Sequence, residues 1–136
     1  YNKGHEKNLD RIMNGMKKAL GYYSKNFSPF QYKQMRIMEF PRYASFAQSF
    51  ANTVPFSESM GFVMDIQKDD PDIPFYVTAH ELGHQWWGHQ VIEANVKGNG
   101  MLSETLSEYS ALMVLKNQVS TEAMQKFMNL LVIIGN

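Results

Sequence analysis

The sequence lacks the features that define several classes of protein. It has no cysteine, which excludes disulfide-stapled scaffolds and thiolate zinc sites. Basic and acidic side chains number 13 each, so no excess of positive charge is available to attract nucleic acid or an anionic membrane. No apolar run approaches the ~18–20 residues of a membrane span. We therefore expect no nucleic-acid partner and no membrane-spanning helix within this sequence.

The sequence does contain enough apolar material for one folded unit. Of its 136 residues, 44% are hydrophobic and 13% are aromatic, which is typical of a globular domain. It opens on Tyr1 rather than Met and has no signal-like stretch, which predicts a piece of a longer protein. We expect residues 1–136 to form a single fragment of one larger domain.

The spacing of apolar residues predicts a helix, then strands, then further helices. Residues 8–23 follow helical spacing with Asn8 as the N-cap, and residues 33–40 and 61–66 alternate as strands do. Further helices are predicted over 74–88 and 102–116, and Ser120 is expected to cap a last one. This order predicts an α+β fold, with a helix-and-strand region at about 1–70 and a helical region at about 71–136.

The most informative stretch is His80-Glu81-Leu82-Gly83-His84. On a helix, positions i and i+4 share a face, so both imidazoles can reach one metal ion while Glu81 leans toward the same space. This face is opposite the apolar stripe of the predicted helix. The pattern is typical of a zinc site in which the two histidines are ligands and the glutamate is the general base of a metallopeptidase.

Two histidines leave a third protein ligand to be found. Glu104 is the first candidate, because 19 residues separate it from His84 and it lies near the start of the next predicted helix. Glu108, one turn later, is either the alternative ligand or an outer partner that orients a ligand. The other histidines are expected to stay outside the site, with His89 as a surface or packing residue and His5 in solvent.

The run Val77-Thr78-Ala79-His80-Glu81-Leu82-Gly83-His84-Gln85-Trp86-Trp87-Gly88 closely resembles the zinc helix of the aminopeptidase N family. That family belongs to the thermolysin-like gluzincins, in which a glutamate on the following helix completes a His-His-Glu site. The resemblance implies a thermolysin-like catalytic core with a short mixed sheet and a helical lobe. It also implies one Zn²⁺, held by His80, His84 and Glu104, with Glu81 as the catalytic residue.

A second, weaker match lies upstream of the zinc helix. Glu58-Ser59-Met60-Gly61 is similar to the E-N-W-G portion of a strand motif in the same family. The resemblance implies that Glu58 binds the free α-amine of a peptide substrate. The sequence departs from the family where Val54-Pro55-Phe56-Ser57 replaces its G-x-M and where Ser59 replaces its asparagine. The spacing between His84 and Glu104 equals that of thermolysin, one residue longer than in these aminopeptidases.

The resemblance implies a zinc-dependent peptidase that hydrolyses peptide bonds and removes N-terminal residues. The alternatives are a thermolysin-type endopeptidase and a non-catalytic zinc- or peptide-binding module of a larger membrane-associated protein. The match resembles divergent aminopeptidase-like domains fused to bacterial transporter permeases more than any well-studied exopeptidase, which implies a bacterial source and a membrane or transporter partner. The family's catalytic tyrosine would lie beyond Asn136, and Tyr109 is expected to pack on its own helix instead.

Overall fold

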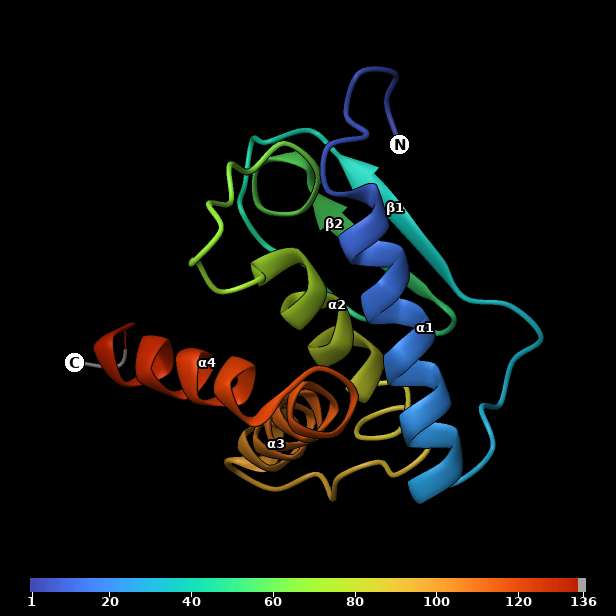
Figure 1. Cartoon of the computed structure of the whole chain (residues 1–136). Helices are drawn as coiled ribbons and strands as arrows, with labels where there is room; N and C mark the ends of the chain where they lie inside the picture. The colour runs from blue at the N-terminus through green and yellow to red at the C-terminus, as the bar shows by residue number, and fades with distance from the viewer. Residues whose placement is uncertain (135–136) are drawn as a thin grey trace.

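The computed structural model describes residues 1–134, which form an α+β fold (Figure 1). The elements are α1 (Leu9–Asn26), β1 (Arg36–Phe40), β2 (Thr53–Ser57), the π-helical turn η1 (Glu58–Phe62), α2 (Ile73–Gly83), α3 (Asn99–Gln118) and α4 (Thr121–Ile134). Figure 1 shows α2 at the centre, between α1 on one side and the α3–α4 pair on the other, with the strands beyond one end of it. The predicted α+β class is confirmed.

The apolar stripe expected on α2 forms the middle of the core. Phe75, Ala79 and Leu82, together with Trp86 just after the helix, are each at most 3% exposed. They pack against buried side chains of α1, α3 and α4, among them Ala19, Tyr23, Ala111, Val114 and Phe127. Because this face of α2 is covered by three helices, His80 and Glu81 lie on the other side of the helix.

The two strands pair in parallel, whereas a mixed sheet was predicted. Arg36 lies opposite Thr53 and Phe40 lies opposite Ser57. Within the described residues, antiparallel pairing occurs only as two isolated bridges, Ala47–Phe56 and Phe50–Thr53. The first strand prediction is confirmed from Arg36 onward. The sequence pattern missed β2 because Pro55 interrupts it, although Val54 and Phe56 are completely buried.

The strand predicted at residues 61–66 is wrong. Its first two residues end the π-helical turn η1, which the Val63 N–H closes by donating to the Glu58 carbonyl at 2.9 Å. The Phe62 and Met64 carbonyls accept from the Asn8 side-chain amide at 3.4 and 2.9 Å, so a side chain takes the place of a neighbouring strand. Asn8 does stand at the N-cap position of α1, but its side chain makes these contacts and does not cap the helix.

Two helix boundaries differ from the expectation. α2 ends at Gly83 instead of continuing to residue 88, because the next N–H groups, of Gln85 and Trp86, bond to carbonyls three residues back. α3 begins at Asn99 and is longer than predicted at both ends. The Ser120 cap is confirmed, since its Oγ accepts from the Ala123 N–H at 3.0 Å. None of the helices in residues 1–134 combines the length and apolarity needed to cross a bilayer.

Candidate metal centre

The metal centre is built where α2 and α3 approach each other closely. Gly83, at the end of α2, faces Ser107 of α3, and a Cβ added at Gly83 would lie 3.1 Å from the Ser107 Cα. Glycine therefore lets the two helix backbones come near enough for short side chains to meet. Glu104 stands one turn before Ser107 on α3, so the close approach brings its carboxylate to the polar face of α2.

His80, His84 and Glu104 form a nearly equilateral triangle of ligand atoms. The two Nε2 atoms are 3.2 Å apart, and Glu104 Oε2 lies 3.3 Å from that of His80 and 3.4 Å from that of His84. A tetrahedral ion with ligand bonds of about 2.0–2.1 Å sets its ligand atoms about 3.3–3.4 Å apart. The three residues are thus positioned to bind one small metal ion.

The Nδ1 atom of His80 lies next to a carboxylate. His80 Nδ1 lies 2.9 Å from Glu108 Oε2, although the angle is not that of a linear hydrogen bond. The other Glu108 oxygen accepts from the buried Tyr76 hydroxyl. A carboxylate at Nδ1 favours the tautomer whose proton sits there and whose Nε2 lone pair is free for a metal. The structure therefore favours Glu108 as a residue that orients His80 over Glu108 as a metal ligand.

His84 is oriented in the same sense by a backbone carbonyl. Its Nδ1 lies 3.1 Å from the Trp87 carbonyl oxygen and 3.3 Å from Ser103 Oγ, which itself donates to the Trp87 carbonyl at 2.9 Å. Because α2 ends at Gly83, the chain turns after His84 and brings the Trp87 carbonyl back to its ring. Both imidazoles therefore present Nε2 to the same point.

Glu81 lies beside the triangle in a buried position. It is 7% exposed and, with the three ligand residues, lines a cavity of about 270 Å³. Burial raises the pKa of its carboxyl to about 7, helped by the charge of Glu104 and opposed by His80 and by a hydrogen bond from the Ser49 N–H. A carboxyl with a pKa near neutrality beside a metal site is suited to accepting and returning a proton.

The segment that carries Ser49 is fixed by a single buried amide. Gln85 donates from Nε2 to Ser49 Oγ at 2.6 Å and to the Phe50 carbonyl at 2.8 Å, and its Oε1 accepts from the Asn52 N–H at 3.0 Å. Gln85 is completely buried. It therefore holds residues 49–52 against the end of α2 and sets the position of the N–H that reaches Glu81.

The pKa values of the two histidines are shifted in opposite directions. Burial acts to lower the pKa of His80, but the contact with Glu108 and the charges of Glu81 and Glu104 raise it overall. Burial and the charge of His80 lower the pKa of His84. The pKa of Glu108 is also lowered, because its contacts with His80 and Tyr76 outweigh the effect of burial. In the metal-free protein, His84 thus loses its proton at a lower pH than His80 does.

Glu58 stands apart from these residues. It does not line the metal cavity, and its partners are Arg42, whose Nε is 3.4 Å from Oε1, and His5, whose Nδ1 is 3.8 Å from Oε2. The expectation that His5 is solvated is wrong, because this imidazole also contacts Glu39. The role of Glu58 in binding a substrate amine stays a prediction.

Two further residues differ from their predicted positions, and two residues of the site were not predicted at all. His89 lines the metal cavity, so the expectation that it stays outside the site is wrong. Tyr109 is 60% exposed, so the expectation that it packs on its helix is also wrong. Sequence reasoning missed Tyr76 and Ser49. Tyr76 precedes His80 by one helical turn, a spacing that does predict a shared face, whereas Ser49 lies in an irregular segment whose position no periodicity predicts.

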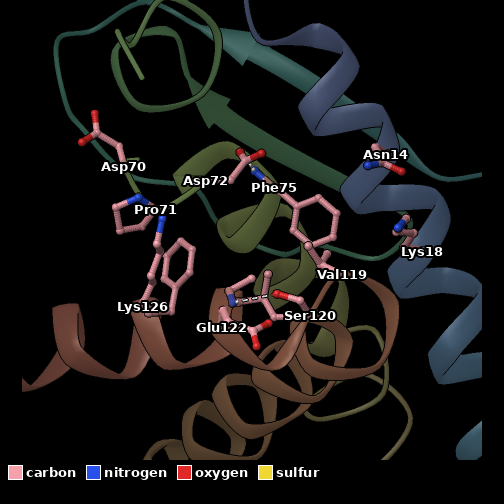
Figure 2. Close-up of a pocket in the computed structure, with 13 residues that line it drawn as sticks. Asn14, Lys18, Asp70, Pro71, Asp72, Phe75, Val119, Ser120, Glu122 and Lys126 are labelled. Atoms are coloured by element: carbon pink, nitrogen blue, oxygen red, sulfur yellow. Dashed lines mark hydrogen bonds between the residues drawn. The ribbon is translucent and has the colours of Figure 1, made fainter. Parts of the chain in front are cut away.

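A second cavity, of about 300 Å³, lies between α1, α4 and the loop before α2 (Figure 2). Its apolar floor includes Phe75 and Phe127, and its lining also carries both signs of charge. Within residues 1–134 it contains no histidine, and no group of three potential metal ligands is found in it. It shares no lining residue with the metal cavity.

The chain matches no protein-family model, and no curated protein matches it. A function for this chain must therefore be argued from the site itself and from the motif that it contains.

Proposed function

We propose that this chain is the metal-binding core of a zinc-dependent peptidase with a thermolysin-like fold. The observation that supports this most is the triangle of two imidazole nitrogens and one carboxylate oxygen, with sides of 3.2–3.4 Å, beside the buried Glu81. Three protein ligands of these types are the donor set of catalytic zinc, which keeps its remaining position for water or substrate. A closed structural zinc site would need a fourth protein ligand.

Zinc fits this donor set better than the hard cations do. Imidazole nitrogen suits zinc, whereas calcium and magnesium take oxygen ligands almost exclusively. When bound, zinc supplies Lewis-acid polarisation of the scissile carbonyl and of the attacking water. The side chains of His80, His84 and Glu104 would hold it, and Glu108 and the Trp87 carbonyl fix the two rings in the orientation needed.

Glu81 carries the proton in this proposal. Its carboxylate takes a proton from the attacking water and passes it to the amine of the leaving group, acting first as a general base and then as a general acid. The Ser49 N–H acts on this carboxylate and lowers its pKa, against the larger effect of burial. Of the two carboxylates nearest the histidines, Glu104 is exposed and Glu108 is turned to His80.

Two modes of peptide cleavage remain as separate proposals. The resemblance to aminopeptidases favours removal of N-terminal residues, with Glu58 binding the α-amine. The position of Glu58 favours the endopeptidase instead, because Glu58 lies outside the metal cavity and already has Arg42 and His5 as partners. Acetylating the α-amine of a test peptide separates them, since an aminopeptidase loses its activity and an endopeptidase keeps it.

The function is tested by the Glu81→Gln substitution in the full-length protein. We expect zinc content equal to that of the unmodified protein and a loss of peptide turnover of at least 10²-fold, because the substitution removes the base and keeps its shape. Glu122→Gln, an exposed acid on α4, is the matched control and should change neither quantity. Zinc binding without turnover in the unmodified full-length protein would overturn the peptidase and favour the binding module.

A further inference from the structure

A second cluster of metal-ligating side chains lies at the carboxyl ends of the two strands. Glu39 is the fourth residue of β1 and Glu58 directly follows β2, so the parallel pairing places both acids at the same end of the sheet. His5 comes from the segment before α1. Figure 1 shows this N-terminal segment beside the arrowheads of β1 and β2. One imidazole and two carboxylates, from three segments far apart in sequence, thus lie close together.

The two carboxylates are removed from solvent, and they are only partly neutralised. The Glu39 side chain is 1% exposed and that of Glu58 is 14% exposed. Among the described residues, the cation paired with them besides His5 is Arg42, whose side chain is 71% exposed and lies 3.4 Å from Glu58. Buried carboxylates are costly unless a charge close to them compensates. A solvated guanidinium on one side of Glu58 compensates only in part.

A proton on His5 cannot satisfy both acids. Its Nδ1 contacts Glu39 Oε1 but lies 3.8 Å from Glu58 Oε2, which is beyond hydrogen-bond distance. The pKa of Glu39 is lowered, because hydrogen bonds from His5 and the Asn2 N–H outweigh the effect of burial, so its carboxylate is ionised at neutral pH. The three potential ligand atoms lie within 4.8 Å of one another.

We propose that His5, Glu39 and Glu58 form a second metal site, separate from the first, that binds a divalent transition-metal ion such as Zn²⁺ or Mn²⁺. One imidazole and two carboxylates suit these ions, which accept both nitrogen and oxygen ligands. The ion would contact both Glu39 and Glu58, whereas a proton on His5 Nδ1 reaches only Glu39. It also fastens the N-terminal segment to the end of the sheet.

This second site does not depend on the proposed peptidase function, because it shares no residue with the first. It does bear on the mode of cleavage. An ion on Glu58 occupies the carboxylate that the resemblance assigns to a substrate amine, which is the situation expected of an endopeptidase.

The site is tested by counting metal ions on the full chain after a chelator has stripped it. Equilibrium dialysis against Zn²⁺, read by elemental analysis, should give two ions per chain for the unmodified protein. Glu39→Gln and His84→Ala should each leave one, and the combination should leave none. Glu122→Gln, an exposed acid on α4, is the matched control, because Glu122 belongs to neither group, and it should leave two. A count of one in the unmodified protein, or of two in Glu39→Gln, would overturn the proposal.

A second measurement uses only the unmodified protein, so its result does not depend on whether the variants fold. The chain has four histidines, whose ring nitrogens give separate ¹⁵N resonances. On adding zinc, we expect the resonances of His5, His80 and His84 to move to metal-bound positions. A His5 resonance that does not move with zinc would exclude the second site, even if the first site fills.

Discussion

At the scale of single residues, each imidazole of the candidate metal centre has an oxygen atom next to its Nδ1, from Glu108 for His80 and from the Trp87 carbonyl for His84. His80 has Glu108 at Nδ1, and Glu108 in turn accepts from the Tyr76 hydroxyl, whose ring stacks on Phe127 of α4 at a centroid distance of 4.2 Å. The position of the His80 ring is thus connected, through three side chains, to the packing of the last helix. Such outer contacts fix both the tautomer and the direction of the ring.

This chain of contacts predicts that Glu108 affects zinc affinity without touching the ion. Glu108→Ala should weaken zinc binding about 10–100-fold, and Tyr76→Phe should weaken it less, because only one acceptor bond of Glu108 is lost. Competition with a chromophoric chelator measures both. Tyr109→Phe, at the exposed neighbouring position of α3, should bind zinc normally. Normal affinity in Glu108→Ala would mean that Glu108 does not orient His80.

Glu81 predicts a pH dependence of stability in the metal-free protein. Its folded-state pKa is about 7 and its ordinary value is 4.5, so between these pH values the folded chain keeps a proton that the unfolded chain has lost. The free energy of unfolding should therefore fall as the pH rises through this interval, by on the order of 3 kcal/mol from this residue. The raised pKa of His80 acts in the same direction, because stability is lost as His80 deprotonates.

Urea unfolding of the chelator-treated protein from pH 4.5 to pH 7.5 measures this dependence. Glu81→Gln cannot ionise, so its profile should be flatter than that of the unmodified protein by the contribution of Glu81. Parallel profiles for the two proteins would show that the carboxyl of Glu81 is not perturbed in the folded state.

At the scale of elements, close contacts between helices decide the geometry that the site needs. Gly15 of α1 faces Phe75 of α2, and a Cβ added there would lie 2.8 Å from the Phe75 carbonyl oxygen. Backbone atoms cannot move aside as the end of a flexible side chain can. The contact therefore sets how near α1 lies to the helix that carries both histidines.

This contact predicts opposite effects of one substitution at two positions of α1. Gly15→Ala should destabilise the protein by about 1–3 kcal/mol, because the added methyl group separates α1 from α2. Gly21→Ala, where nothing lies within 4 Å of the added atom, should stabilise it by about 0.5–1 kcal/mol, because alanine has the better helix propensity. Chemical denaturation measures both, and equal effects at the two positions would contradict the packing described.

The elements also show which parts of the fold the sequence could predict. Helical spacing of apolar residues predicted α1, α2 and α4, and α3 was predicted after a glycine-rich turn signal. Pro55 masked β2. The alternation of Phe62, Met64 and Ile66 looked like a strand, but the carbonyls at 62 and 64 accept from Asn8 instead. His80, Glu81 and His84 follow from a local motif. The positions of Ser49, Glu39 and His5 depend on long-range contacts that periodicity does not encode.

At the scale of the whole molecule, the proposed zinc ion would join α2 to α3 across the loop of residues 84–98. An ion that binds only the folded chain stabilises it by about 2.7 kcal/mol when its free concentration is 100 times the dissociation constant. We therefore expect zinc to raise the melting temperature of the chelator-stripped protein. Glu104→Ala, which removes the ligand on α3, should show a smaller rise, and an equal rise would contradict a site that bridges the two helices.

The central claim is that His80, His84 and Glu104 bind one zinc ion in front of Glu81. An anomalous difference map at the zinc absorption edge, from crystals of the zinc-loaded full chain, tests this most directly. The account predicts a peak about 2.0–2.1 Å from both Nε2 atoms and from a Glu104 oxygen, with Glu108 at the outer nitrogen of His80. No peak at this position, or a peak ligated by Glu108 in place of Glu104, would contradict it.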